Sequence, residues 1–444
     1  MKLTRSLAVA ILVGVSGMLP TAVIAAGERP DRTGTDDIDA APDFELPAVQ
    51  LRIALDRVLG EHAFLSIEAM RTGIAGGTEF EVAAAVLEEN TVELLELVEA
   101  AYGPPAAVAF GEQWRNHLAY LVDYTRAVAD GDDDARDLAS SQLQTYVDDF
   151  STLLAAANPS LPPDVVEGLI AEHVQQLEQI GSFADAGFAE AYPAIRETYA
   201  HMFAVGDGLS VGILSQFGDR FPGQDTAFSP ALDMRITLDR LLGEHTYLAA
   251  IAMRARLTDA ADLNAAVSAL DANSAALAAQ ITQIYGNEAG AAFGSLWTSH
   301  TDHYLDYVES VAAGRAAALD DALDGLRTYR SDFSSFLASA NPFLDQRAFE
   351  RLLATHTGHL VAQVTAYEDR DYEEAYDTLR DAYGHTGQLA AGLGGAIADQ
   401  FPRLFPDTAL KPGSSGGWLA ALGWLLLAAA TADGALRRRA FNRA

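Results

Sequence analysis

The chain of 444 residues exceeds what one hydrophobic core normally supports, so its length predicts two or three domains. Its 62 acidic and 29 basic residues give a formal net charge of -33, and a polyanionic surface repels nucleic acid and anionic lipid. No nucleic-acid partner is therefore expected. The absence of cysteine excludes disulfides, thiolate metal sites and cysteine nucleophiles.

The first 26 residues have the pattern of a secretory signal peptide and predict export. Lys2 and Arg5 precede an apolar run, which ends in small residues that suit cleavage after Ala25 or Ala26. Residues 27–46 are rich in Asp, Pro, Gly and Thr, so we expect a disordered leader there.

Residues 47–223 are predicted to form an up-and-down helical bundle of about six helices. Ala and Leu dominate, and apolar residues recur at helical spacing between breaks rich in Gly and Pro, so the expected fold class is all-α. The expected helices span 48–72, 79–101, 105–130, 134–157, 163–183 and 187–218.

A second bundle of the same kind is expected over residues 229–407. Its helix breaks match those of the first bundle and fall at Thr258-Asp259, Gly286, Gly314, Asn341-Pro342 and Asp369-Arg370. The short joint between Phe221 and Pro230 leaves open whether the bundles lie side by side or hinge.

An internal repeat relates the two predicted bundles. The stretch Leu51–Arg71 returns at Met234–Arg254, 183 positions later, with Leu-Asp-Arg, Leu-Gly-Glu-His and Ala-Met-Arg retained. After a one-residue insertion the offset becomes 184, so that Tyr199 matches Tyr383. We interpret the chain as a tandem duplication of one helical unit.

Eight of the ten histidines occupy equivalent positions in the two halves. The pairs are His62/His245, His117/His300, His173/His356 and His201/His385. His303 and His359 occur in the second half only. If the helices alternate in direction, the four repeated histidines of a unit lie about 15–20 Å from the same bundle end, at a rise of about 1.5 Å per residue. Asn90, and with it the equivalent Asn273, falls in the same layer.

Several imidazoles at one depth of a helical bundle suit a transition metal or a haem iron, so we expect the eight repeated histidines to be metal ligands. Glu197 and Asp381 stand four residues before His201 and His385, on the same helix faces, and are expected to be ligands or orienting carboxylates. Asn90 and Asn273 are candidate hydrogen-bond partners of the imidazoles.

Glu61 and Glu244, each next to a repeated histidine, point about 100° away around the helix and are poorer partners.

Two other interpretations of the histidine layer remain open. The layer could be a hydrogen-bonded polar core that specifies helix register in a structural or protein-interaction module. It could also serve a metal-dependent enzyme, but the chain has no His-Glu-x-x-His, Gly-x-Ser-x-Gly, P-loop or dinucleotide motif, and no catalytic residue is predicted.

Four charged positions of the first helix also repeat. They are Arg52/Arg235, Asp56/Asp239, Arg57/Arg240 and Arg71/Arg254. Asp56 follows Arg52 at i,i+4 spacing, which predicts an ion pair on the surface of the helix. The alternative is a face that binds an anion or a partner protein.

The C-terminal residues predict a membrane-directed tail. A flexible linker at 408–416 leads to an apolar stretch at 417–436 and a basic tail at 437–444. The uninterrupted apolar run from Gly417 to Ala432 is short for a transmembrane helix, which normally needs about 20 residues. The arginines are expected to stay in the cytoplasm, with both bundles outside it.

This tail resembles the GlyGly-CTERM class of bacterial sorting signals. The matching residues are Ser414-Ser415-Gly416-Gly417, Trp418 to Ala432, and Arg437 to Arg439. The resemblance implies recognition by a rhomboid-type sorting protease (a rhombosortase), removal of the hydrophobic tail and transfer to the cell surface. The alternative is an ordinary C-terminal membrane anchor, and both interpretations place the protein in the cell envelope.

Overall fold

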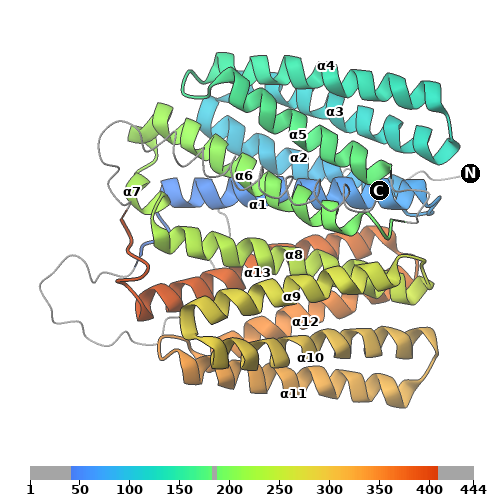
Figure 1. Cartoon of the computed structure of the whole chain (residues 1–444), viewed down its shortest axis with the longest axis vertical. Helices are drawn as coiled ribbons and strands as arrows, with labels where there is room; N and C mark the ends of the chain where they lie inside the picture. The colour runs from blue at the N-terminus through green and yellow to red at the C-terminus, as the bar shows by residue number, and fades with distance from the viewer. Residues whose placement is uncertain (1–41, 183–187, 409–444) are drawn as a thin grey trace, which may run out of the picture.

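The computed structural model describes residues 42–182 and 188–408, and this part of the chain is α-helical without a strand (Figure 1). None of the helices described is long and apolar enough to cross a membrane. The predicted signal peptide, most of the predicted leader and nearly all of the predicted C-terminal tail lie outside the described residues.

The first six helices follow one another in antiparallel order. They are α1 (Pro47–Ile74), α2 (Phe80–Tyr102), α3 (Pro104–Asp130), α4 (Asp133–Ala157), α5 (Pro163–Gly181) and α6 (Tyr192–Phe217). The prediction of six helices here is confirmed, with most ends within three residues of those expected. The exception is α6, which begins at Tyr192 and not at 187, because Phe188 to Ala191 form a turn with a positive φ at Phe188.

A short connection and six more long helices complete the described chain. They are η3 (Gly218–Arg220), α7 (Gln224–Ala227), α8 (Pro230–Thr258), α9 (Leu263–Tyr285), α10 (Asn287–Ala312), α11 (Ala316–Ala340), α12 (Gln346–Glu368) and α13 (Tyr372–Gln400). The expected breaks at Gly286, Gly314, Asn341 and Asp369 lie between these helices, and the expected break at Thr258-Asp259 falls at the end of α8.

Local sequence explains the tight turns. Gly103 has φ 86°, a conformation that side-chain-bearing residues rarely adopt, and Pro104 then begins α3 at a position that needs no amide donor. Gly131 ends α3 in the left-handed conformation, and the Asp132 carboxylate caps α4 by accepting from the Ala135 amide.

The two central helices, α1 and α8, carry the core. The N-terminal group (α1–α6) packs α2, α3 and α6 around α1, and the C-terminal group (α8–α13) packs α9, α10 and α13 around α8. The two groups lie side by side, with α1 against α8 and the small helix α7 against both (Figure 1). Because α1 and α8 have neighbours on nearly every side, most of their charged residues are buried.

The prediction that Arg52 and Asp56 form an ion pair on the surface of α1 is wrong, because both side chains are buried. Arg52 is 7% exposed and donates to Asp207 at 2.6 Å, to Asp233 at 2.8 Å and to the Ala227 carbonyl at 2.7 Å. Asp56 is 1% exposed, and neither carboxylate oxygen has a hydrogen-bond partner among the described residues. Burial, followed by the charge of Asp207, raises the pKa of Asp56 well above its usual value.

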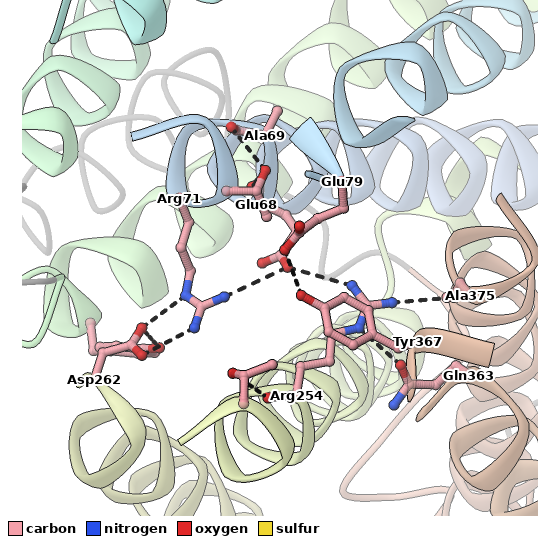
Figure 2. Close-up of polar contacts among 12 residues, drawn as sticks. Glu68, Ala69, Arg71, Glu79, Arg254, Asp262, Gln363, Tyr367 and Ala375 are labelled. Atoms are coloured by element: carbon pink, nitrogen blue, oxygen red, sulfur yellow. Dashed lines mark hydrogen bonds and ion pairs between the residues drawn. The ribbon is translucent and has the colours of Figure 1, made fainter. Parts of the chain in front are cut away.

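A cluster of buried charges joins the two groups at the end of α1 (Figure 2). Arg71 of α1 donates to both carboxylate oxygens of Asp262, which precedes α9, at 2.8 and 3.1 Å. Arg254 of α8 approaches Glu68 of α1 at 3.5 Å. Since each arginine reaches a carboxylate of the other group, the cluster ties the two groups together.

The last residues of the predicted leader are packed. Phe44 is 8% exposed, its ring lies 5.0 Å from the guanidinium carbon of Arg235, and its carbonyl accepts from the Gln50 side chain at 2.6 Å. Phe44, within the predicted leader, is therefore packed against the folded part of the chain.

Candidate functional site

Three of the four predicted histidines of the N-terminal group converge in its core. His62 comes from α1, His117 from α3 and His173 from α5, and all three are at most 4% exposed. The Nε2 atoms of His62 and His117 lie 3.4 Å apart. The ring centroid of His62 is 5.2 Å from that of His117 and 5.5 Å from that of His173. We call this cluster the first histidine trio.

The C-terminal group contains the matching cluster. His245 of α8, His300 of α10 and His356 of α12 form the second histidine trio. The Nε2 atoms of His245 and His300 lie 3.1 Å apart, and the ring centroid of His245 is 5.0 Å from that of His300 and 5.9 Å from that of His356. The two sets of three repeated positions therefore have the same arrangement.

Aromatic side chains enclose each trio. Trp114 lies 4.7 Å from the His62 ring, and Tyr146 stacks on His117 at 4.7 Å and 21°. In the second trio Tyr329 stacks on His300 at 4.7 Å and 16°. The imidazoles are thus removed from water and held by flat, poorly polar neighbours.

Burial sets the protonation state of the trios. It lowers the pKa of His117 and of His300 to about 3. Burial, with the neighbouring imidazoles adding to it, also lowers the pKa of His62 and of His245 well below the usual value. The rings are therefore neutral near pH 7, which is the form in which imidazole binds a metal.

Several ring nitrogens in the trios lack a hydrogen-bond partner. Within residues 42–182 and 188–408, both nitrogens of His173 and both of His356 are buried without one, as are Nδ1 of His62 and Nδ1 of His245. A neutral imidazole always carries one N–H, so a buried ring without partners costs about 1–3 kcal/mol. Such atoms in a folded protein call for an explanation, for example a bound ion or water.

A small cavity adjoins each trio. A space of about 20 Å³ is lined by His117 and His173, and one of about 10 Å³ by His245, His300 and His356. These volumes are near the minimum that holds a single water molecule. An ion fits such a space, whereas a haem does not, so the haem alternative is physically unsuited to these histidines.

The fourth predicted histidine of each group lies outside the trio. Nε2–H of His201 donates to the Leu169 carbonyl at 2.9 Å, and its Nδ1 lies 3.8 Å from the Glu172 carboxylate. Nε2–H of His385 donates to the Leu352 carbonyl at 2.8 Å. Both rings therefore brace neighbouring helices through backbone hydrogen bonds.

The predicted orienting carboxylates, Glu197 and Asp381, are exposed. No ion pair joins either of them to a histidine in the part of the chain that the structure describes. Each carboxylate faces solvent, whereas each histidine ring bonds to a carbonyl of the adjacent helix, so the i,i+4 spacing does not bring the two side chains together.

The two predicted asparagines are buried, but they donate hydrogen bonds to a glutamate and a backbone carbonyl instead of to the histidines. Asn90 donates to the Val58 carbonyl at 2.9 Å and to Glu61 at 3.0 Å. Asn273 donates in the same way to the Leu241 carbonyl at 2.9 Å and to Glu244 at 2.7 Å. These side chains hold a buried glutamate in place.

The glutamates of Leu-Gly-Glu-His are the residues that sequence reasoning undervalued. Glu61 of α1 receives Arg380 of α13 at 3.2 Å, and Glu244 of α8 receives Arg196 of α6 at 2.7 Å. Each arginine thus forms an ion pair with the glutamate of the other helix group. The presence of this glutamate at equivalent positions in both halves was the one sequence feature that could have indicated its role.

The described residues contain no ready-made group of three or more His, Asp or Glu side chains in an arrangement that would hold a metal ion. Comparison with known proteins adds no assignment, since no family model, curated protein or solved structure matches the chain. Any functional conclusion therefore rests on the residues themselves.

Proposed function

We propose that the chain is a tandem duplication of a six-helix unit, and that each unit binds one transition-metal ion through its histidine trio. The internal repeat of the sequence supports the duplication, and the origin of each trio supports it further. The first trio comes from the first, third and fifth helices of its group, and so does the second.

The observation that carries the metal proposal is the pair of fully buried, unpartnered imidazoles of His173 and His356, each beside two facing Nε2 atoms. Two ligand nitrogens about 2.0–2.1 Å from one tetrahedral ion stand roughly 3.3–3.4 Å apart. The observed separations of 3.4 and 3.1 Å are close to that value. Binding requires the third ring to turn toward this pair.

The donor set selects the class of metal. Three neutral imidazoles without a carboxylate suit zinc, copper or nickel, and they do not suit magnesium or calcium, which prefer oxygen ligands. A transition metal with three protein ligands would retain one open position. Because each adjoining cavity has room for about one water molecule, binding of the ion is better supported than turnover of an organic substrate.

A structural role is the second candidate. Tyr146 stacked on His117 and Tyr329 stacked on His300 support it, because such contacts can align helices without a metal. In that case the stability of the protein would not depend on metal.

We also propose that the protein is exported and attached to the cell envelope. The predicted signal peptide (1–26) supports export, and the resemblance of the tail (417–444) to GlyGly-CTERM signals supports processing by a rhombosortase. Deletion of residues 417–444 should release the protein into the medium. Retention of the shortened protein in the envelope fraction would contradict this proposal.

The metal proposal is tested by removing one ligand from each trio. We expect His173→Phe with His356→Phe to lose most of the zinc or copper that the unaltered protein holds after loading and gel filtration. The matched control, His201→Gln with His385→Gln, removes the same number of histidines outside the trios and should retain the metal. Equal metal contents in the two variants would contradict the proposal, and unchanged thermal stability with a chelator would favour the structural role.

A further inference from the structure

An open groove of about 1180 Å³ lies where the two helix groups meet. One wall is formed by α1 and α2, the other by α12 and α13. Its apolar surface includes Ile53, Val58, Leu97 and Leu352. A groove of this size is large enough for a small organic ligand, and the trio sites do not use it.

Three acidic side chains of α2, two of which line the groove, have no acidic counterpart in the second half. Glu89, Glu93 and Glu96 stand one turn apart along α2, and the first two bind Arg380 at 2.7 and 2.8 Å. The positions 183 residues later are Ala272, Ala276 and Ala279. The second copy of the helix therefore lacks all three carboxylates.

The α12 wall differs from its counterpart in the same way. Arg351 and His359 line the groove, whereas the equivalent positions 183 residues earlier are Gly168 and Gln176. In contrast, Glu61, Arg380, Tyr383 and His385 have identical counterparts in the other half. The groove lining therefore combines residues that the two halves share with charged residues, such as Glu93, Glu96 and Arg351, that have no charged counterpart in the other half.

The charges of the lining indicate the sign of the ligand. The Arg380 guanidinium is matched by three carboxylates, those of Glu61, Glu89 and Glu93. Glu96 and Asp381 are exposed on opposite walls, and no ion pair is recorded for either within the described chain. A net charge of -33 further favours a cation.

Arg57, deeper in the groove, pairs with Asp239 of α8 and so contributes little free positive charge. Arg351 is exposed on α12 and opposes a cation at its own part of the rim. The positive groups of the ligand are therefore expected to lie against α2 and α13.

We propose that this groove binds an aliphatic polyamine. Its methylene chain would cover the apolar surface, while its ammonium groups would meet Glu96 on one wall and Asp381 on the other. Such a ligand combines the two properties that the lining offers, an apolar body and separated positive charges.

The first test measures spermidine binding to the metal-free full chain by calorimetry at about 150 mM salt, where diffuse attraction is screened. Glu96→Gln with Asp381→Asn should weaken binding at least tenfold. The control, Glu197→Gln with Glu112→Gln, removes the same charge elsewhere, and Glu197 is the counterpart of Asp381 in the other half. Its affinity should equal that of the unaltered protein.

A second test fills the groove without changing its charge. Gly384 lines the groove on α13, and a Cβ added there would meet no atom within 4 Å. Gly384→Phe should therefore fold normally and weaken spermidine binding at least tenfold. Gly358→Phe, on the exposed surface of α12 with equally open surroundings, should have no effect.

The proposal is overturned if the unaltered protein does not bind spermidine, or if both charge-removing variants lose affinity equally. It is also overturned if Gly384→Phe binds as tightly as Gly358→Phe. Because the measurements use metal-free protein and leave the trios intact, they are independent of whether the trios bind metal.

Discussion

His117 and His300 show at the residue scale how burial controls chemistry. Their folded-state pKa of about 3 lies below the value of about 6.5 expected in the unfolded chain. Between these values the unfolded chain binds protons that the folded chain does not, so stability is complete above about pH 6.5 and is lost as the pH falls toward 3. Asp56, with its raised pKa, acts in the opposite direction and offsets part of this loss.

We therefore predict that the free energy of unfolding of the metal-free protein falls steadily from about pH 6.5 to pH 4. Each trio histidine should contribute about 1.4 kcal/mol per pH unit within this range. Urea denaturation at a series of pH values measures the slope. His117→Phe with His300→Phe should make it shallower, and an unchanged slope would show that these rings are not neutral in the folded state.

Sequence reasoning grouped three of the four repeated histidines correctly but not the direction of the fourth ring. The repeat and the helix rise identified His62, His117 and His173 correctly as neighbours. His201 lies in the same half, yet its ring binds the Leu169 carbonyl, because position along a helix axis does not specify rotation about it. Glu61 was undervalued because its partner, Arg380, comes from the other helix group and no local pattern reveals it.

At the scale of the elements, the glycine of Leu-Gly-Glu-His allows close helix packing. A Cβ at Gly60 of α1 would overlap the Phe203 ring of α6, and a Cβ at Gly243 of α8 would overlap the Tyr199 hydroxyl and lie 2.6 Å from the Tyr383 ring. These contacts explain why both copies of the motif carry glycine within a helix, where it otherwise weakens the helix.

Gly60→Ala and Gly243→Ala should each destabilise the protein by roughly 1–3 kcal/mol, because helices already in contact would have to separate. Gly358→Ala is the control, since the same change there meets open space and should stabilise α12 by up to about 1 kcal/mol. Chemical denaturation measures all three. Similar effects at Gly60 and Gly358 would contradict the close packing of α1 with α6.

Most helix boundaries were predictable because their signals are local, as at Gly103-Pro104 and at Gly131. The packing of Phe44 in the predicted leader could not be predicted in this way, because it depends on Arg235, a residue of the distant helix α8. The polar character of α1 was misjudged for a related reason. A helix with charged residues normally faces water, whereas α1 is surrounded by helices of its own group and by α7 and α8, and residues of both groups pair with most of its charges.

At the scale of the whole molecule, the two groups are joined by a reciprocal exchange of arginines. Arg380 reaches Glu61, and Arg196 reaches Glu244, and both glutamates are at most 4% exposed. Loss of one partner leaves a buried carboxylate without its cation, which typically costs about 3–5 kcal/mol.

Arg380→Met should therefore lower the free energy of unfolding by about 3 kcal/mol, somewhat less than the fully buried limit because its side chain is 13% exposed. Adding Glu61→Leu should restore part of the loss, since the uncompensated charge is then removed. Arg115→Met breaks an exposed pair with Glu88 and should cost less than 1 kcal/mol. Equal costs for Arg380→Met and Arg115→Met would show that the exchange does not hold the groups together.

The metal-binding claim is tested most directly by anomalous diffraction from crystals of the protein loaded with zinc. We predict two strong peaks per chain, one within about 2.1 Å of the Nε2 atoms of His62 and His117, the other equally close to those of His245 and His300. Absence of density at both trios, with zinc only at surface carboxylates, would contradict the account and leave the trios as structural elements of the core.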